Sequence, residues 1–244
     1  MAKLSDAWNP ARCGWEAESC GACAEDLGRK AGSAVETRER VQVPTMGIGA
    51  NSIWASNVFT GLPASEEPLR AEAREVTKRR AAGGSERLPS EGCRPLAYPA
   101  ATLLALFHKI VQTPGLTLML IEFDKTYRQI YTDGRPLPVN PQPSWYGYSV
   151  ERWEDETFVV ETNGLNDRAW IDTSGHPRSE AMRIVERYRR RDFGHLDVEI
   201  AFNDPTFYTR PFSINVTHEL QADTDILEYV CTEDDGRQRP GRQP

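Results

Sequence analysis

Residues 146–163 read Tyr146-Gly-Tyr-Ser-Val-Glu-Arg-Trp-Glu-Asp-Glu-Thr-Phe-Val-Val-Glu-Thr-Asn163, which is two strand-like runs joined by a tight turn at Asp155-Glu156. Strand-like runs then follow one another as far as Cys231 with almost no helix between them: Met182–Asp192, His195–Asp204, Phe212–Leu220 and Ile226–Cys231. Strands joined by short turns form an antiparallel meander. A long meander buries its apolar face by closing on itself or by folding into two packed sheets. The sequence therefore predicts an all-β domain with an interior.

The strand pattern extends upstream of this stretch. Three further runs are His108–Thr113, Leu116–Phe123 and Thr126–Thr132, with turn signals at Pro114-Gly115 and Asp133-Gly134. A loop rich in proline, Arg135–Ser144, follows them and is too dense in proline for a sheet. We predict that residues 93–235 form a lipocalin-like barrel of eight or nine antiparallel strands, with a β-sandwich as the alternative.

The remaining segments have other compositions. Residues 1–45 are rich in glycine, alanine and charge without periodicity, which predicts a disordered or loosely packed extension. Residues 46–92 form a helical lead-in, with a surface helix capped by Ser65 and ended by Gly83-Gly84. Residues 236–244 are predicted to be a disordered tail.

Charge and hydropathy exclude several classes of partner. The chain has 244 residues and a formal net charge of -7, which argues against nucleic acid. The longest apolar run, Leu116–Ile121, is far shorter than the roughly 20 residues of a membrane span. The N-terminus shows no apolar core of signal-peptide length, so the chain as written is expected in the cytoplasm. Nothing in the sequence indicates an oligomeric state.

From Ile110 to Cys231 the chain resembles an uncharacterised family of mostly secreted bacterial β-rich proteins. The resemblance is carried by Ile110-Val-Gln-Thr-Pro-Gly115, Tyr127-Arg-Gln-Ile-Tyr-Thr-Asp-Gly-Arg-Pro136, Trp145-Tyr-Gly-Tyr-Ser149, Gly175-His-Pro177 and Leu227-Glu-Tyr-Val-Cys231. It implies a β-rich domain and brings no activity with it. The chain departs from the family pattern at Arg178, where a second histidine is expected, and at Glu151, where glycine is common.

Cysteine spacing gives one further expectation. The cluster Cys13, Cys20 and Cys23 lacks a fourth ligand and a nearby histidine, so no zinc site is predicted. Cys93 and Cys231 bracket the β domain and lie in or beside segments that match the family. We expect their Cα atoms to lie within disulfide range.

Strand alternation predicts which polar side chains point inward. Glu186 shares a face with Met182, Ile184 and Tyr188, and His218 shares one with Ile214 and Val216. In the predicted strand Leu116–Phe123, we expect Leu116, Leu118 and Leu120 to form the inner face. Two readings stay open: Glu186 pairs with Arg152 or Arg128 and His218 bonds a backbone carbonyl, or both line a pocket as acid and base.

The loop Gly164–Glu180 is long for a compact β domain and dense in polar and aromatic groups. One interpretation places it over the barrel mouth, with Asp172 orienting His176 for proton exchange with a ligand. A divalent-metal site on Asp172, His176 and Glu180 and ordinary turn chemistry are the alternatives. Because His176 lies in a loop, its replacement by glutamine is expected to leave the fold intact.

The predicted site combines these groups with aromatic side chains that would surround an apolar ligand. The catalytic candidates are His176, Asp172, Glu186 and His218. The ligand-binding candidates are Tyr127, Arg128, Tyr146, Tyr148, Trp153, Trp170, Asn166 and Asp167. No cofactor and no metal are expected, and motifs for serine hydrolases, P-loops and dinucleotide binding are absent.

Three functions remain open from the sequence. The first is a cofactor-independent isomerase, lyase or cyclase that acts by acid–base chemistry on a hydrophobic or aromatic small molecule, and it needs ionisable groups converging on an open cavity. The second is a non-catalytic small-molecule-binding protein, which needs a cavity with apolar walls. The third is an interaction module without a cavity.

Overall fold

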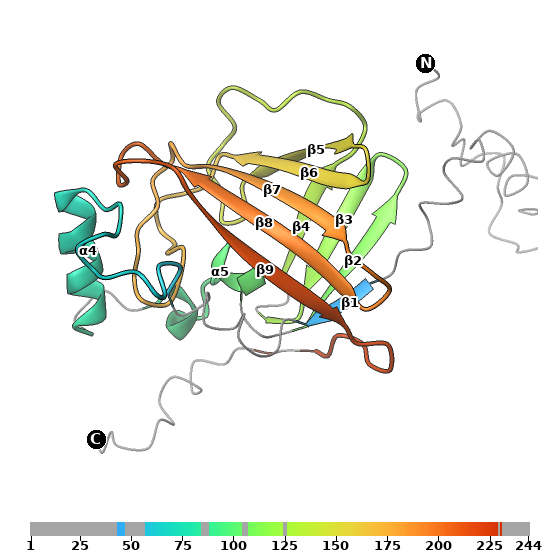
Figure 1. The fold of residues 1–244 in the computed structure, drawn as a ribbon, viewed down its shortest axis with the longest axis horizontal. Helices are drawn as coiled ribbons and strands as arrows, with labels where there is room; N and C mark the ends of the chain where they lie inside the picture. Colours follow the sequence, from blue (N-terminus) through green and yellow to red (C-terminus); the bar gives the residue numbers. More distant parts are fainter. Residues whose placement is uncertain are drawn as a thin grey trace, which may run out of the picture. The chain divides into compact units, whose positions relative to one another are not determined.

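Nine β-strands make one sheet that closes into a barrel in the computed structural model (Figure 1). The structure describes residues 57–83, 88–103, 107–123, 126–228 and 230, together with the backbone of 43–46, all within the unit Val41–Pro244. The all-β barrel predicted from the strand pattern is confirmed.

Each strand pairs with the next along the chain, and β1 pairs with both β2 and β9 to close the ring. Among these strands every pair is antiparallel except β4 and β5, which run parallel over Ile130–Ser149 and Tyr131–Val150. The bounds are β1 Val43–Met46, β2 His108–Thr113, β3 Leu116–Ile121, β4 Thr126–Tyr131, β5 Tyr148–Glu154, β6 Thr157–Asn163, β7 Arg183–Arg190, β8 His195–Asn203 and β9 Phe212–Leu220.

The parallel pair departs from the expected meander for a simple reason. The proline-rich loop between β4 and β5 carries the chain back along the barrel, so β5 starts beside the end of β4. The first strand, β1, spans the predicted boundary between the N-terminal extension (1–45) and the helical lead-in (46–92). The barrel therefore recruits a strand from outside 93–235, and residues 1–42 lie outside the described part of the chain.

Burial follows strand alternation on β7 and β9. Glu186 and Tyr188 are buried on β7, and Val216 and His218 on β9, as predicted.

On β3 the predicted inner face is wrong: Thr117, Met119 and Ile121 are buried, and the three leucines face outward, half-buried. Both faces of this strand are apolar, so the pattern alone does not choose between them.

Helices are few among the described residues: α4 (Ala71–Ala81), α5 (Ala100–Leu103) and the 3-10 turn η4 (Pro89–Gly92). The predicted capping by Ser65 is wrong, because α4 begins after Arg70 and no side chain caps it. The backbone just before α4 is used elsewhere: Arg70 N–H donates to Phe207 O at 2.8 Å, and Thr209 N–H donates to Pro68 O at 2.7 Å. Tertiary pairing with the β8–β9 loop therefore replaces the first helical turn.

The predicted strand Ile226–Cys231 is also wrong as far as it is described. Residues 226–228 and 230 are not in a strand, and Leu227 is 72% exposed.

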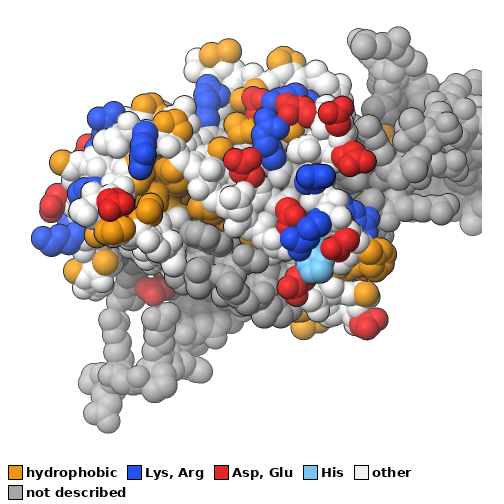
Figure 2. Space-filling model, in the orientation of Figure 1, with side chains coloured by type: hydrophobic (Ala, Val, Ile, Leu, Met, Phe, Trp, Pro, Cys, Tyr) orange, Lys and Arg blue, Asp and Glu red, His pale blue; other side chains and the backbone are white. Residues whose placement is uncertain are grey.

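Basic and acidic side chains lie next to one another on the face of the molecule shown in Figure 2. On the outer face of the sheet Arg187 donates to Glu154 at 2.6 Å, and Arg152 pairs with Glu154 and Glu161. Arg191 lies 3.3 Å from Asp197. The run of arginines at 187–191 is thus partly neutralised by ion pairs along the strands, which fits a solvated strand face.

Candidate ligand-binding site

An open pocket with a volume of about 150 Å³ lies at the end of the barrel that holds the β2–β3, β5–β6 and β7–β8 turns. We call it the mouth pocket. Its walls are inward-facing strand residues: Ile110, Thr117, Met119, Ile130, Phe158, Tyr188, Leu196 and Leu220. Its rim carries Gln112, Trp153, Glu156, Arg190, Phe193 and His195. The walls are mainly apolar, and such cavities accept apolar guests rather than water.

A buried ion pair occupies the barrel interior but does not line this pocket. Arg128 and Glu186 are both 1% exposed, and Arg128 donates to the two Glu186 carboxylate oxygens at 3.0 and 2.5 Å. Arg128 also donates to the hydroxyls of Ser149 and Thr162, and Tyr188 Oη donates to Glu186 Oε1 at 2.5 Å. The interpretation in which Glu186 pairs with Arg128 describes this geometry.

Tyr98 packs its ring over the Arg128 guanidinium at 4.0 Å. Burial, and next the Glu186 charge, raise the pKa of Tyr98 and of Tyr188 well above the usual value. Burial alone would lower the pKa of Arg128, but the Glu186 carboxylate more than offsets this and raises it. The charges of the pair are therefore satisfied internally, and both tyrosines keep their protons at neutral pH.

His218 lies against His108 inside the barrel, with ring centroids 4.7 Å apart at 87°. His218 is 5% exposed, and its Nδ1 has no hydrogen-bond partner among the described residues. The interpretation in which His218 bonds a backbone carbonyl is therefore not met at Nδ1. Burial and then the neighbouring His108 lower the pKa of His218 well below the usual value. His218 does not line the mouth pocket.

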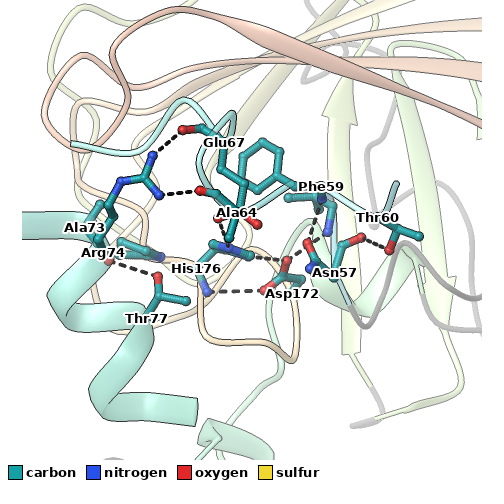
Figure 3. A network of polar contacts seen from close by, with 12 residues as sticks. Asn57, Phe59, Thr60, Ala64, Glu67, Ala73, Arg74, Thr77, Asp172 and His176 are labelled. Carbon is teal, nitrogen blue, oxygen red and sulfur yellow. Dashed lines mark hydrogen bonds and ion pairs between the residues drawn. The ribbon is translucent and has the colours of Figure 1, made fainter. Parts of the chain in front are cut away.

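The loop Gly164–Glu180 brings Asp172 and His176 into contact, as the sequence predicts (Figure 3). His176 Nδ1 lies 2.6 Å from Asp172 Oδ2, and His176 Nε2 lies 3.9 Å from Glu67 Oε2. Asp172 also accepts the backbone N–H of Val58 at 2.9 Å, and Phe59 meets the His176 ring edge-on at 5.0 Å. The Asp172–His176 pair thus ties the lead-in to the loop.

The Asp172–His176 pair lies at the end of the barrel opposite to the mouth pocket. The loop joins the end of β6 to the start of β7, which is the end opposite to the β5–β6 and β7–β8 turns. Asp172 and His176 are 0% and 2% exposed, and neither lines the mouth pocket. Because His176 is packed rather than exposed, the premise that this loop residue contributes little packing is wrong. The effect of its replacement on the fold stays a prediction.

Of the other loop candidates, Asn166 and Trp170 have structural partners. Asn166 accepts two hydrogen bonds from Arg178, at 2.7 Å to its carbonyl and 3.0 Å to its side chain. Trp170 lies under the Arg80 guanidinium of α4, 4.9 Å from the ring centre, and Asp167 is exposed. None of the three lines the mouth pocket.

Arg178 is fully buried and forms no hydrogen bond or ion pair with a carboxylate among the described residues. Besides Asn166 it donates to the carbonyls of Tyr98 and Trp145. Burial lowers its pKa to about 9, so it stays charged at neutral pH. The residue fastens three segments of backbone at one end of the barrel.

Tyr127, Tyr146 and Tyr148 gather at a second site, on the outside of the barrel. They line a groove with a volume of about 510 Å³ between β4 and residues 141–148. Tyr131 and Trp145 complete its aromatic lining, and we call it the tyrosine groove. Of the predicted ligand-binding residues, Trp153 is the one that reaches the mouth pocket.

The rim residue His195 forms an acid–base pair with Asp192 beside the pocket, which the sequence analysis missed. His195 Nδ1 lies 2.7 Å from Asp192 Oδ1, in the β7–β8 turn, and the His195 side chain is 40% exposed. The hydrogen bond with His195 lowers the pKa of Asp192. In the sequence, the signal for this pair was that Asp192 and His195 lie three residues apart in a predicted turn. Because histidine near aspartate in an exposed turn is common, this spacing alone does not indicate a site.

Cys93 is disulfide-bonded. Cys231 and the three N-terminal cysteines lie outside the described residues, so the Cys93–Cys231 pairing stays a prediction, which peptide mapping of the unreduced protein would check. Within the described residues no group of three or more His, Cys, Asp or Glu side chains is arranged to hold a metal ion.

In comparisons with protein-family models, curated proteins and solved structures, nothing matches this chain. The family resemblance of residues 110–231 is therefore neither supported nor opposed. Among the described residues, no helix has both the length and the apolar character that crossing a membrane requires.

Proposed function

We propose that this protein binds a small, uncharged, largely apolar molecule in the mouth pocket and does not transform it. The support is the combination of an open cavity with mainly apolar walls and predicted catalytic groups, Glu186, Asp172 and His176, that are paired elsewhere. Glu186 is bound to Arg128 below the pocket, and Asp172 and His176 lie at the other end of the barrel. This pattern meets the requirement for a lipocalin-like binding protein better than that for an enzyme.

A fluorescent apolar probe tests the proposal. N-phenyl-1-naphthylamine should gain fluorescence on binding to the full chain, and Ile110→Trp should weaken that binding at least about tenfold, because the new side chain fills an apolar pocket. Val111→Trp is the matched control, since Val111 follows Ile110 on β2 and points to the opposite side of the sheet. Equal affinity in both variants, or no binding to the wild type, would reject the proposal.

An acid–base enzyme is the second candidate, and the His195–Asp192 pair on the pocket rim is the observation that favours it. Asp192 would orient the ring, and His195 would exchange a proton with a ligand in the pocket. If a ligand that co-purifies in native mass spectrometry is chemically altered by the wild type and is bound unaltered by His195→Gln, the enzyme replaces the binding protein as the better reading.

A further inference from the structure

The tyrosine groove lies at a place where two neighbouring strands of the barrel wall are only briefly paired. Since β4 and β5 pair over two residues only, the outward side chains of Tyr127 and Gln129 on β4 extend beyond the paired part. Residues 141–148 run past them and form the opposite wall. The groove is thus built into the seam between two strands, and it is separate from the mouth pocket.

The wall formed by residues 141–148 is held in place by backbone contacts. Ser144 N–H donates to Gly164 O at 2.8 Å, and Trp145 O accepts from Tyr98 N–H and from Arg178. Gly147 has φ +69°, and a Cβ there would lie 2.6 Å from Asn163 O, so only glycine allows this close approach. A groove with fixed walls costs little entropy to occupy.

The aromatic side chains of the groove are also held in position. The rings of Tyr131 and Tyr148 lie 5.0 Å apart at 31°. Arg135 stacks on Tyr131 at 3.9 Å and donates to Tyr148 Oη at 3.2 Å, while Asp133 neutralises its charge at 2.6 Å. Tyr127 is 58% exposed and offers a ring to a ligand.

The chemistry of the lining is uncharged throughout, although 27% of the residues of the chain are charged. Between the aromatic rings lie Thr126, Gln129, Gln142 and Ser144. Their side chains can both donate and accept hydrogen bonds, and no hydrogen bond joins them to another described residue. Exposed rings next to amides and hydroxyls suit a ligand with C–H faces and neutral hydroxyl groups.

We propose that the tyrosine groove binds a neutral saccharide, with Tyr127 stacking on a sugar face and Gln129 and Gln142 bonding its hydroxyls. A proline-rich peptide is the other ligand of aromatic grooves. The saccharide is favoured because four side chains with both donor and acceptor groups are distributed along the groove. A polyproline helix offers acceptors almost alone, since proline has no backbone N–H.

Affinity electrophoresis of the full chain in gels that contain hydroxyethylcellulose, amylopectin, xylan or barley β-glucan tests this proposal. We expect retardation by at least one polysaccharide, and a loss of association of about tenfold or more in Tyr127→Ala, from the lost stacking. Gln129→Ala should weaken binding as well. Phe193→Ala is the matched control: it removes an exposed aromatic from the rim of the mouth pocket and should leave retardation unchanged.

The two sites can be separated in one set of proteins. Tyr127→Ala should keep the binding of N-phenyl-1-naphthylamine, so loss of saccharide binding would not reflect a failed fold. No retardation of the wild type by any of the four polysaccharides, or equal retardation of Tyr127→Ala, overturns the proposal. Binding of a deca-proline peptide that is lost in Tyr127→Ala, without retardation by a polysaccharide, would assign the groove to peptides instead.

Discussion

Arg128 and Glu186 face each other across the barrel interior, from β4 and β7, and each is the principal partner of the other's charge. Neither side chain reaches solvent, and the hydroxyls around them complete their hydrogen bonds. A buried pair of this kind contributes little net stability compared with apolar residues, but breaking it is costly.

Glu186→Gln should therefore lower the free energy of unfolding by about 3–5 kcal/mol, because it leaves the Arg128 charge buried and unpaired. The double variant Arg128→Met with Glu186→Leu should recover most of that loss. Urea denaturation measures both, with Glu199→Gln, on an exposed site of β8, as the control. A loss in Glu186→Gln no larger than in the control would show that water already reaches the pair.

His218 predicts a stability that depends on pH. Burial and His108 hold its folded pKa below that of the unfolded chain, about 6.5. As the pH falls below about 6.5, the unfolded chain takes up a proton that the folded barrel refuses, so stability falls by up to about 1.4 kcal/mol per pH unit. His218→Met should flatten the profile between pH 7.5 and 5. An unchanged profile in His218→Met would place the titration elsewhere.

His176→Gln should reduce stability by about 1–3 kcal/mol, since the Asp172 carboxylate loses its side-chain partner in a buried site. Binding of N-phenyl-1-naphthylamine should persist, because the mouth pocket lies at the other end of the barrel. Thermal unfolding and probe titration measure the two effects, and Thr173→Ala, exposed on the same loop, is the control. Loss of binding with unchanged stability would return the loop to a functional role.

Truncation separates the N-terminal segments. Deleting residues 1–40 should change the melting temperature by no more than about 2 °C, whereas deleting residues 1–46 should lower it by about 5 °C or more, because it removes the strand that joins β2 to β9. Differential scanning calorimetry distinguishes the two. Equal melting temperatures would show that the barrel does not depend on β1.

Most strands could be predicted because their apolar residues alternate with polar ones. β7 and β9 have one apolar and one polar face, which sets both their extent and the inward direction of Glu186 and His218. β3 is apolar on both faces, so its inner face could not be derived from the local pattern. β1 is a short segment that contains Pro44, so its pairing with β2 and β9 could not be derived locally either. The parallel β4–β5 pair depends on where the loop returns, which no local pattern encodes.

The site was less predictable for a related reason. The sequence indicated that Glu186 is inward and that Asp172 neighbours His176, but inward position does not distinguish a pocket wall from a paired charge beneath it. Which end of the barrel a loop covers follows from topology. The mouth pocket is made by residues from eight strands and two turns, and its rim residue His195 pairs with Asp192 in a turn with no distinctive motif.

The closure of the barrel by β1 has a consequence for how the chain folds. β5 to β9 are successive neighbours in the sequence and can assemble as hairpins soon after they are synthesised, whereas β1 needs an edge that appears last. Thr45 pairs with Leu220, so the first strand to leave the ribosome waits for the last before the ring is complete. Until then the nascent sheet exposes the edge of β9, and closure of this long loop is expected to be the slow, aggregation-sensitive step of folding.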